Sequence, residues 1–195
     1  MPTLSVLDAM RAAWQPERLH DPGVIRAVPP LELETAADPA QVRRFERFMI
    51  TTAMPHAPLK GLIAQVALSE GVVAGKLRKE FAAVKALRDA GVPLVMGSDS
   101  GNWPIMPFEF HGPTSIRELE LMVEAGLTPE EALRSATTTA AAMLGRDDLG
   151  KVAPGSVGDL VLVRGDPLAD VSVLRDPAWV VVGGVADTPA GWMAR

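Results

Sequence analysis

A short apolar segment between two glycines constrains the fold of this chain more than any other feature. The segment VPLVMG, residues 92–97, follows Gly91, which ends a helical pattern within residues 61–90. An apolar run of this length is typical of a parallel strand that is covered on both faces. The connection from helix to strand is short, as in α/β units. The sequence therefore predicts an α/β fold with a buried strand at this position.

The residues before this segment predict helices and one loop. Residues 4–10 and 41–52 show helical patterns of apolar side chains. Residues 20–40 contain four prolines, and because the residue before a proline is pushed out of the α region, we expect a loop there. Within residues 61–90, we expect Phe81, Val84 and Leu87 to form a buried stripe.

The residues after the apolar segment predict two capped helices and then a change to β structure. One helix has Ser115 and Glu118 in capping-box spacing, and the next opens with Thr128, Pro129 and Glu131. Beyond these helices, turn residues alternate with β runs at 160–163 and 180–182. We therefore place a domain boundary between residues 1–149 and residues 150–195.

Charge and composition exclude several classes of function. The net charge of −5 gives no broad positive field, so we expect no nucleic-acid partner. No run approaches the roughly 20 apolar residues of a membrane span, so we expect no membrane insertion either. Cysteine is absent and there are only three histidines, which leaves Asp, Glu and these histidines as candidate metal ligands.

Asp99 is the strongest candidate for a chemical role. It comes directly after the predicted strand and before a loop rich in glycine, proline and aromatic residues. In parallel α/β folds, ligands and catalytic groups collect at the carboxyl ends of strands. A carboxylate there can bind a divalent metal or act as a general base, although an aspartate that caps a turn or helix is an equal alternative from position alone.

Two residues of the following loop are candidates for contact with a substrate. His111 ends the loop and could lean over the same pocket as Asp99, while Trp103 could supply an apolar wall. The alternative for the histidine is a surface or packing role. For the aromatic residues of this loop, Trp103 among them, the alternative is anchoring the loop to the core.

Three motifs in succession resemble the C-terminal part of the metal-dependent amidohydrolases. They are GVPLVMGSDSG at residues 91–101, HGPTSIRELELMVEAG at 111–126 with its following helix, and LGKVAPGSVGDLVLV at 149–163. The imidazolonepropionase-like and Xaa-Pro dipeptidase-like groups are the most similar. The resemblance implies a fold made of the last strand or two of a TIM barrel with its outer helices, followed by part of a small β-sandwich cap domain.

The resemblance also implies a hydrolase of carbon–nitrogen bonds in amide, cyclic amide or dipeptide-like substrates. It places Asp99 at a metal and at the proton of the attacking water, and His111 at the border of the substrate. It implies a divalent metal, zinc for preference, but the family's H-x-H and later histidines have no counterpart here. We therefore expect metal binding only if other polypeptide supplies the missing ligands, and expect the chain alone to be inactive.

Several alternatives stay open at this point. The chain could be a non-catalytic remnant or interaction module, or a complete small α/β binding domain, which requires more strands than the sequence offers. As a C-terminal fragment it would expose strand edges, which favours self-association or pairing with an N-terminal half. The compartment is unknown: a soluble cytoplasmic protein is favoured, and export is not excluded.

Overall fold

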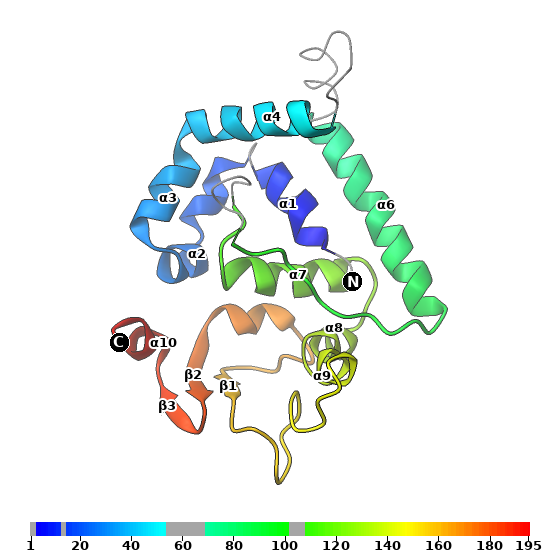
Figure 1. The fold of residues 1–195 in the computed structure, drawn as a ribbon, viewed down its shortest axis with the longest axis vertical. Coiled ribbons are helices and arrows are strands. Elements are labelled where there is room, and N and C mark those ends of the chain that lie inside the picture. The colour runs from blue at the N-terminus through cyan, green and yellow to red at the C-terminus, as the bar shows by residue number, and fades with distance from the viewer. Residues whose placement is uncertain (1–2, 13–14, 54–68, 102–107) are drawn as a thin grey trace. The chain divides into compact units, whose positions relative to one another are not determined.

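The protein is described here from a computed structural model, which describes residues 3–12, 15–53, 69–101 and 108–195 (Figure 1). The chain divides into two compact units. We call residues 3–83 and 97–118 the N-terminal unit, and residues 84–96 and 119–195 the C-terminal unit. Two helices, α6 (Glu70–Asp89) and α7 (Pro113–Glu124), continue from one unit into the other. None of the described helices combines the length and apolar composition that crossing a membrane requires.

The N-terminal unit is helical where the sequence predicted a loop. The predicted helices at 4–10 and 41–52 are confirmed, but residues 20–40 form helices as well, which corrects the loop prediction. The reason is that Pro22 and Pro30 occupy first helical positions, where a fixed φ suits the helix and no N–H is needed. In the described ranges, the helices before α6 are α1 (Leu4–Ala12), η1 (Pro16–His20), α2 (Pro22–Ala27), α3 (Pro30–Ala37) and α4 (Pro39–Ala53).

Two small apolar clusters among the described residues belong to the core of this unit. In one, Phe110 packs with the buried side chains of Leu19, Val28 and Ala36, and the ring of Phe108 meets that of Phe110 edge to face at 6.5 Å. In the other, residues from three helices meet: Met10 of α1, Phe45 of α4 and Val73 of α6. The aromatic residues at the end of the 98–113 loop therefore anchor that loop to the helices around it.

The predicted strand at residues 92–97 is not a strand in the structure. The segment runs extended but does not pair with a strand in the described part of the chain, and its Met96 N–H donates to Ser135 O at 3.0 Å. Val95 is buried while Val92 is 43% exposed, so the segment is not covered on both faces. A strand needs a neighbouring strand to form the hydrogen bonds of its backbone N–H and C=O groups. An apolar run without such a neighbour therefore does not form a strand.

The stripe predicted on α6 is buried only in part. Val84 is buried, as are Val73 and Leu77, whereas Phe81 is half-buried and Leu87 is 44% exposed, so only the middle member of the stripe of Phe81, Val84 and Leu87 is confirmed. Leu87 lies in the last turn of α6, close to the end of the helix at Asp89.

After α7, the C-terminal unit continues with two short helices, of which the first is capped as predicted. Helix α8 (Pro129–Ala136) starts at Thr128, whose hydroxyl accepts from the N–H of Glu131, while the Glu131 carboxylate accepts from the N–H of Thr128. Helix α9 (Thr138–Met143) follows directly. The capping box at Ser115 and Glu118 was wrong, because α7 already begins at Pro113.

Replacing Thr128 by alanine should lower the free energy of unfolding by about 1 kcal/mol, because the N–H of Glu131 loses its acceptor. Urea denaturation followed by circular dichroism measures the change. Thr139→Ala is the matched control, since Thr139 lies within α9 and caps no helix. Equal effects of the two substitutions would contradict the capping role.

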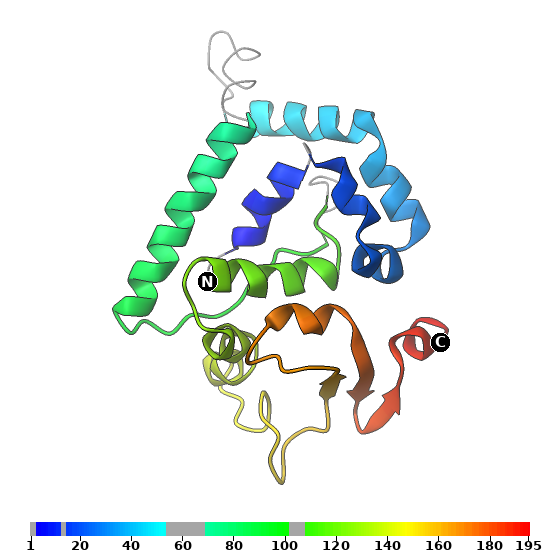
Figure 2. The same cartoon turned by 180° about the vertical axis from the view of Figure 1, so that it is seen from behind.

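The end of the chain forms a three-stranded antiparallel sheet in the order β1-β2-β3 (Figure 2). The β runs predicted at 160–163 and 180–182 are confirmed as β1 and part of β2. The indole N–H of Trp192 ties the last helix to β2 by donating to Val180 O at 2.9 Å. The elements are β1 (Leu160–Val163), η2 (Val171–Arg175), β2 (Pro177–Val182), β3 (Val185–Asp187) and α10 (Pro189–Met193).

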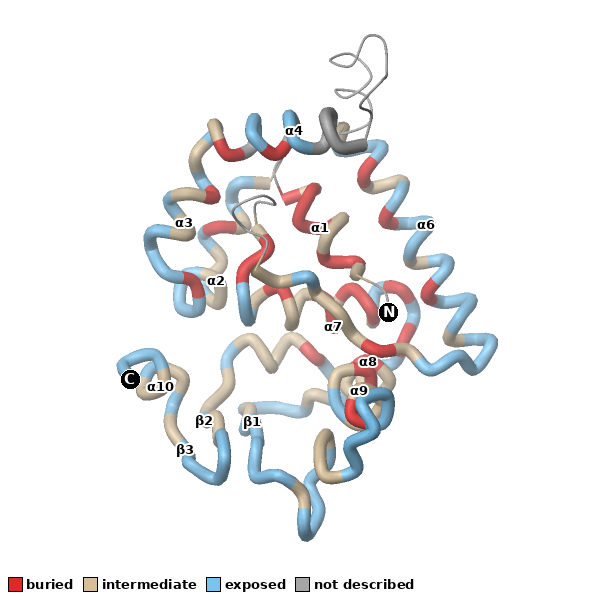
Figure 3. The backbone as a smooth tube through the Cα atoms, viewed as in Figure 1, coloured by how far each residue is buried: buried red, intermediate tan, exposed pale blue. Residues whose placement is uncertain are grey.

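Both faces of this sheet expose apolar side chains. None of its strand residues is buried, as Figure 3 shows by the absence of red along β1, β2 and β3. Val161 on one face is 57% exposed, and Trp179, which pairs with Leu162 on the other face, is 46% exposed. The mixed helices and sheet agree with the predicted α/β class, while the barrel and cap assignments and the boundary at residue 149 stay predictions.

Candidate functional site

Asp99 lies at the end of the extended segment 92–97, in a tight turn of the N-terminal unit. Its φ of 50° is in the left-handed region, which aspartate and asparagine enter more readily than most residues. Its side chain is exposed. The carboxylate is therefore accessible to a molecule from solvent, as a candidate acid–base group needs to be.

His111 lies beside the turn that carries Asp99. The N–H of Gly101 donates to Glu109 O at 3.0 Å, which joins the two ends of the loop. A Cβ atom on Gly101, whose φ is 101°, would lie 2.7 Å from Nε2 of His111, so only glycine lets the imidazole approach this closely. The structure thus brings exposed His111 to the backbone two residues after Asp99. Trp103 lies outside the described residues.

Three serine hydroxyls fix the turn that carries Asp99. Ser98 Oγ lies 2.6 Å from Ser100 Oγ and 3.2 Å from Oγ of Ser115, which is in the first turn of α7. The hydroxyl of Ser5 in α1 donates to Ser98 O at 3.0 Å. Sequence reasoning missed these residues, although the alternation of Ser98 and Ser100 around Asp99 is a signal that both serines share one side of the chain.

A buried carboxylate, Glu118, lies in the electrostatic neighbourhood of Asp99. Its oxygens accept from the backbone N–H groups of Leu4 at 3.1 Å and Ser5 at 2.6 Å, at the start of α1. Burial raises the pKa of Glu118 to about 6, against the lowering by these hydrogen bonds, and the negative charge of Asp99 adds to the increase. Sequence reasoning assigned Glu118 to a helix cap, and the structure uses it to hold a second helix.

The raised pKa of Glu118 predicts a pH dependence of stability. A carboxyl group with a folded pKa above its unfolded value favours folding below pH 4.5, and this contribution is lost as the pH rises through about 6. The loss amounts to about 2 kcal/mol for this group. We expect the free energy of unfolding of Glu118→Gln, relative to the unsubstituted chain, to rise by that amount between pH 4 and pH 7.5. Urea titrations at both pH values measure it, and parallel pH profiles would contradict it.

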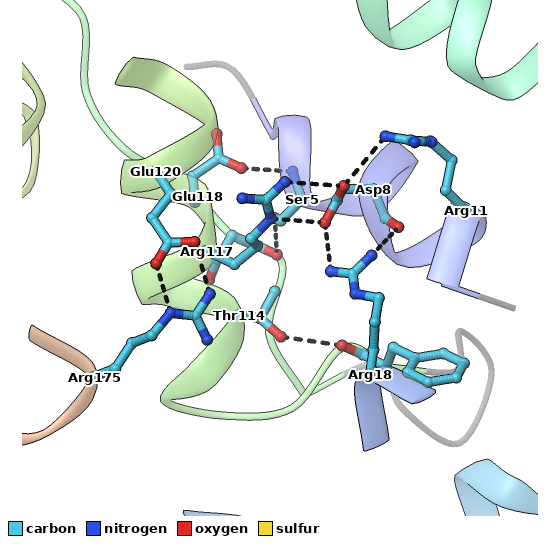
Figure 4. Close-up of polar contacts among 11 residues, drawn as sticks. Ser5, Asp8, Arg11, Arg18, Thr114, Arg117, Glu118, Glu120 and Arg175 are labelled. Atoms are coloured by element: carbon cyan, nitrogen blue, oxygen red, sulfur yellow. Dashed lines mark hydrogen bonds and ion pairs between the residues drawn. The ribbon is translucent and has the colours of Figure 1, made fainter. Parts of the chain in front are cut away.

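A second buried carboxylate, Asp8 of α1, binds arginines from three elements (Figure 4). Its oxygens accept from Arg117 Nε at 2.9 Å and from Arg18 Nη2 at 2.6 Å, and Arg11 Nη1 lies at 3.7 Å. Burial alone would raise the pKa of Asp8, but the hydrogen bonds and charges of Arg117 and Arg18 outweigh it and hold the pKa below its ordinary value. This cluster joins α1, η1 and α7, so we assign it a structural role.

The described residues do not fit a resident metal ion. Among them, no group of three or more His, Asp or Glu side chains converges as a metal site. Asp99 alone offers one carboxylate, and zinc sites need three or four protein ligands. His56 lies outside the described residues. We therefore derive no chemical step through a metal held by this chain.

Comparison with known proteins gives the family to which these features belong. The family model of the amidohydrolases matches residues 20–187. The chain is therefore a member of the amidohydrolase family. That range includes Asp99, His111 and the three-stranded sheet.

Individual relatives agree with this assignment. The imidazolonepropionase of Cereibacter sphaeroides is 36% identical over 97 residues, which are 49% of this chain and 23% of that protein. The chain thus spans about a quarter of the length of that curated relative. Among solved structures, the bottromycin amidohydrolase matches with a TM-score of 0.55 at 24% identity. The match covers 95% of this chain and 36% of the bottromycin amidohydrolase chain. A Xaa-Pro dipeptidase with bound methionine has a TM-score of 0.52 at 23% identity, over 76% of this chain and 33% of its own. These two structures are similar in fold.

Proposed function

We propose that this chain is the C-terminal portion of a hydrolase that cleaves carbon–nitrogen bonds in amide, cyclic amide or dipeptide-like substrates. The position of Asp99 carries the proposal. It is an exposed carboxylate that follows an extended apolar segment, within the residues that match the amidohydrolase family. The serine hydroxyls that hold the turn of Asp99, and the imidazole of His111 beside it, are consistent with a site at this turn.

In this proposal, residues 1–149 supply the last strand or two of a TIM barrel with its outer helices, and residues 150–195 supply part of a small β-sandwich. Two observations support it. The extended segment 92–97 has no strand partner within the described ranges, and the sheet of β1, β2 and β3 exposes apolar side chains on both faces. Strand edges and apolar faces of this kind are covered in stable proteins, so we propose pairing with an N-terminal half, or self-association in its absence.

The residues of this chain have separate tasks in the proposed reaction. Asp99 takes a proton from the attacking water and passes it to the leaving nitrogen, because a carboxylate can serve first as a base and then as an acid. His111 donates a hydrogen bond to the substrate, and Trp103 supplies an apolar contact. A divalent metal, zinc by resemblance, would need all its ligands except Asp99 from polypeptide outside the described residues.

Reconstitution tests the proposal. The segment encoded immediately upstream is expressed separately, provided that it carries an in-frame H-x-H motif, and is mixed with this chain. We expect bound zinc, measured by elemental analysis, and hydrolysis of a panel of dipeptides and cyclic amides only in the mixture. Absence of an upstream H-x-H segment, or a mixture that neither holds metal nor hydrolyses any substrate, would favour a non-catalytic remnant and contradict the proposal.

A further inference from the structure

A cavity in the N-terminal unit lies apart from Asp99 and His111. Its volume is about 680 Å³, and residues of η1, α2, α3 and α4 line it together with Phe108. Neither Asp99 nor His111 is among the lining residues. Cavities of about 300–1,000 Å³ are the usual size for small-molecule sites. The cavity therefore has room for a ligand and does not belong to the turn of Asp99.

The walls of the cavity are apolar. Leu19 and Ala36 belong to the buried cluster around Phe110, so this wall is part of the unit's packed core. Leu33 and Phe108 pack against the same cluster. Ile25, by contrast, is 51% exposed, and a ligand with an apolar body would cover it. The walls thus favour a hydrocarbon or aromatic group.

Charged and polar side chains complete the lining. Arg43 of α4 is exposed, and no ion pair or hydrogen bond links its guanidinium to another residue in the described part of the chain. His20 adds an imidazole that can donate, and Glu34 adds one carboxylate. The nearby carboxylate of Asp38 is already used, because it accepts from Ala40 N at 2.8 Å and lies 3.5 Å from Arg44.

The guanidinium of Arg43 favours an anionic ligand. His20 adds a hydrogen-bond donor to the same lining, while the N-terminus of α4 is already capped by the carboxylate of Asp38. Glu34 opposes Arg43 with a single negative charge. A guanidinium can bind a carboxylate through two parallel hydrogen bonds, which is the geometry that an acid would use here.

We propose that this cavity binds a small carboxylic acid, with its apolar body between Leu19, Ile25 and Phe108 and its carboxylate on Arg43. The proposal does not depend on the hydrolase assignment, because it uses neither Asp99 nor a metal. The cavity can therefore bind the acid in this chain alone, without an N-terminal half.

A matched series of probes on one apolar body tests the ligand class. 3-Phenylpropionic acid, its primary amide and 3-phenylpropylamine differ only in the charge of the end group. In isothermal titration against this chain, we expect saturable binding of the acid, with about tenfold weaker binding of the amide and weaker binding still of the amine. Absence of saturable binding by the acid, or equal affinity for acid and amide, would overturn the proposal. Tighter binding of the amine would do the same.

Three variants test the location. Arg43→Gln should weaken binding of the acid about tenfold and leave the amide unchanged, while Arg47→Gln on the same helix, which does not line the cavity, should change neither. Ala37→Trp places a large ring at an exposed lining position and should abolish binding of both. Loss of acid binding in Arg47→Gln, or retained binding in Ala37→Trp, would place the site elsewhere and overturn the proposal.

Discussion

Replacement of Asp8 by asparagine is expected to lower the free energy of unfolding by about 3 kcal/mol. The carboxylate is 2% exposed and accepts from Arg117 at 2.9 and 3.3 Å and from Arg18 at 2.6 Å. Asparagine keeps the shape but removes the charge that balances these guanidinium groups. The arginine side chains are 23–30% exposed and can partly turn to water, so the expected loss is at the lower end for a broken buried ion pair.

Urea denaturation of the unsubstituted protein and of Asp8→Asn at pH 7 measures the loss. Because the pKa of Asp8 is held below its ordinary value, its contribution is present above pH 3.8 and is lost as the pH falls through the lowered pKa. The difference between the two chains should therefore shrink in strong acid. Asp89→Asn is the control, since the exposed Asp89 pairs with Lys85 on the surface of α6 and should matter little. Equal effects at positions 8 and 89 would contradict the structural role of Asp8.

Local patterns in the sequence predicted the local structure well. The apolar spacing located α1 and α4, and the Thr128 motif located the start of α8, because each depends on residues within one or two turns. Residues 20–40 failed for a related reason. A proline that breaks a helix and a proline that opens one look alike in sequence, and Asp21 before Pro22 was the available sign of a helix start, since Asp21 caps α2.

Features that depend on distant residues could not be predicted. Residues 92–97 have the composition of a strand but lack a neighbouring strand in the described ranges, and no local pattern reveals such a lack. The sequence assigned Glu118 to a helix cap and gave Asp8 no special role, yet Asp8 meets Arg117 and Glu118 meets Ser5 across more than 100 positions of sequence. Their burial is a property of tertiary packing.

The candidate site was predictable from the sequence only in part. The position of Asp99 after an apolar run, and of His111 at the far end of the same loop, were both visible in the sequence. The sequence also raised the possibility that His111 leans over the pocket of Asp99, but it did not reveal the contacts that hold His111 near the turn: the hydrogen bond between Gly101 and Glu109 and the missing Cβ of Gly101.

Asp99→Asn is expected to reduce turnover by a factor of about 10²–10⁴ in the reconstituted enzyme, the range typical of a lost acid–base group. Asparagine suits this test because it tolerates the left-handed backbone at φ 50° as aspartate does. The turn held by Ser98, Ser100 and Ser115 should therefore persist. An amide can neither accept the proton of the attacking water nor return it, so the loss should appear in kcat more than in KM.

Two further variants make the assignment to Asp99 specific. Asp147→Asn removes a charge from an exposed residue outside the candidate site and should leave turnover unchanged. Asp99→Ala opens space for an added carboxylate, so formate should restore part of its activity if the missing function is proton transfer, and should not affect the asparagine variant. Retained turnover in Asp99→Asn would remove Asp99 from the chemistry of the reaction, and an unchanged kcat with a raised KM would make it a substrate-binding residue instead.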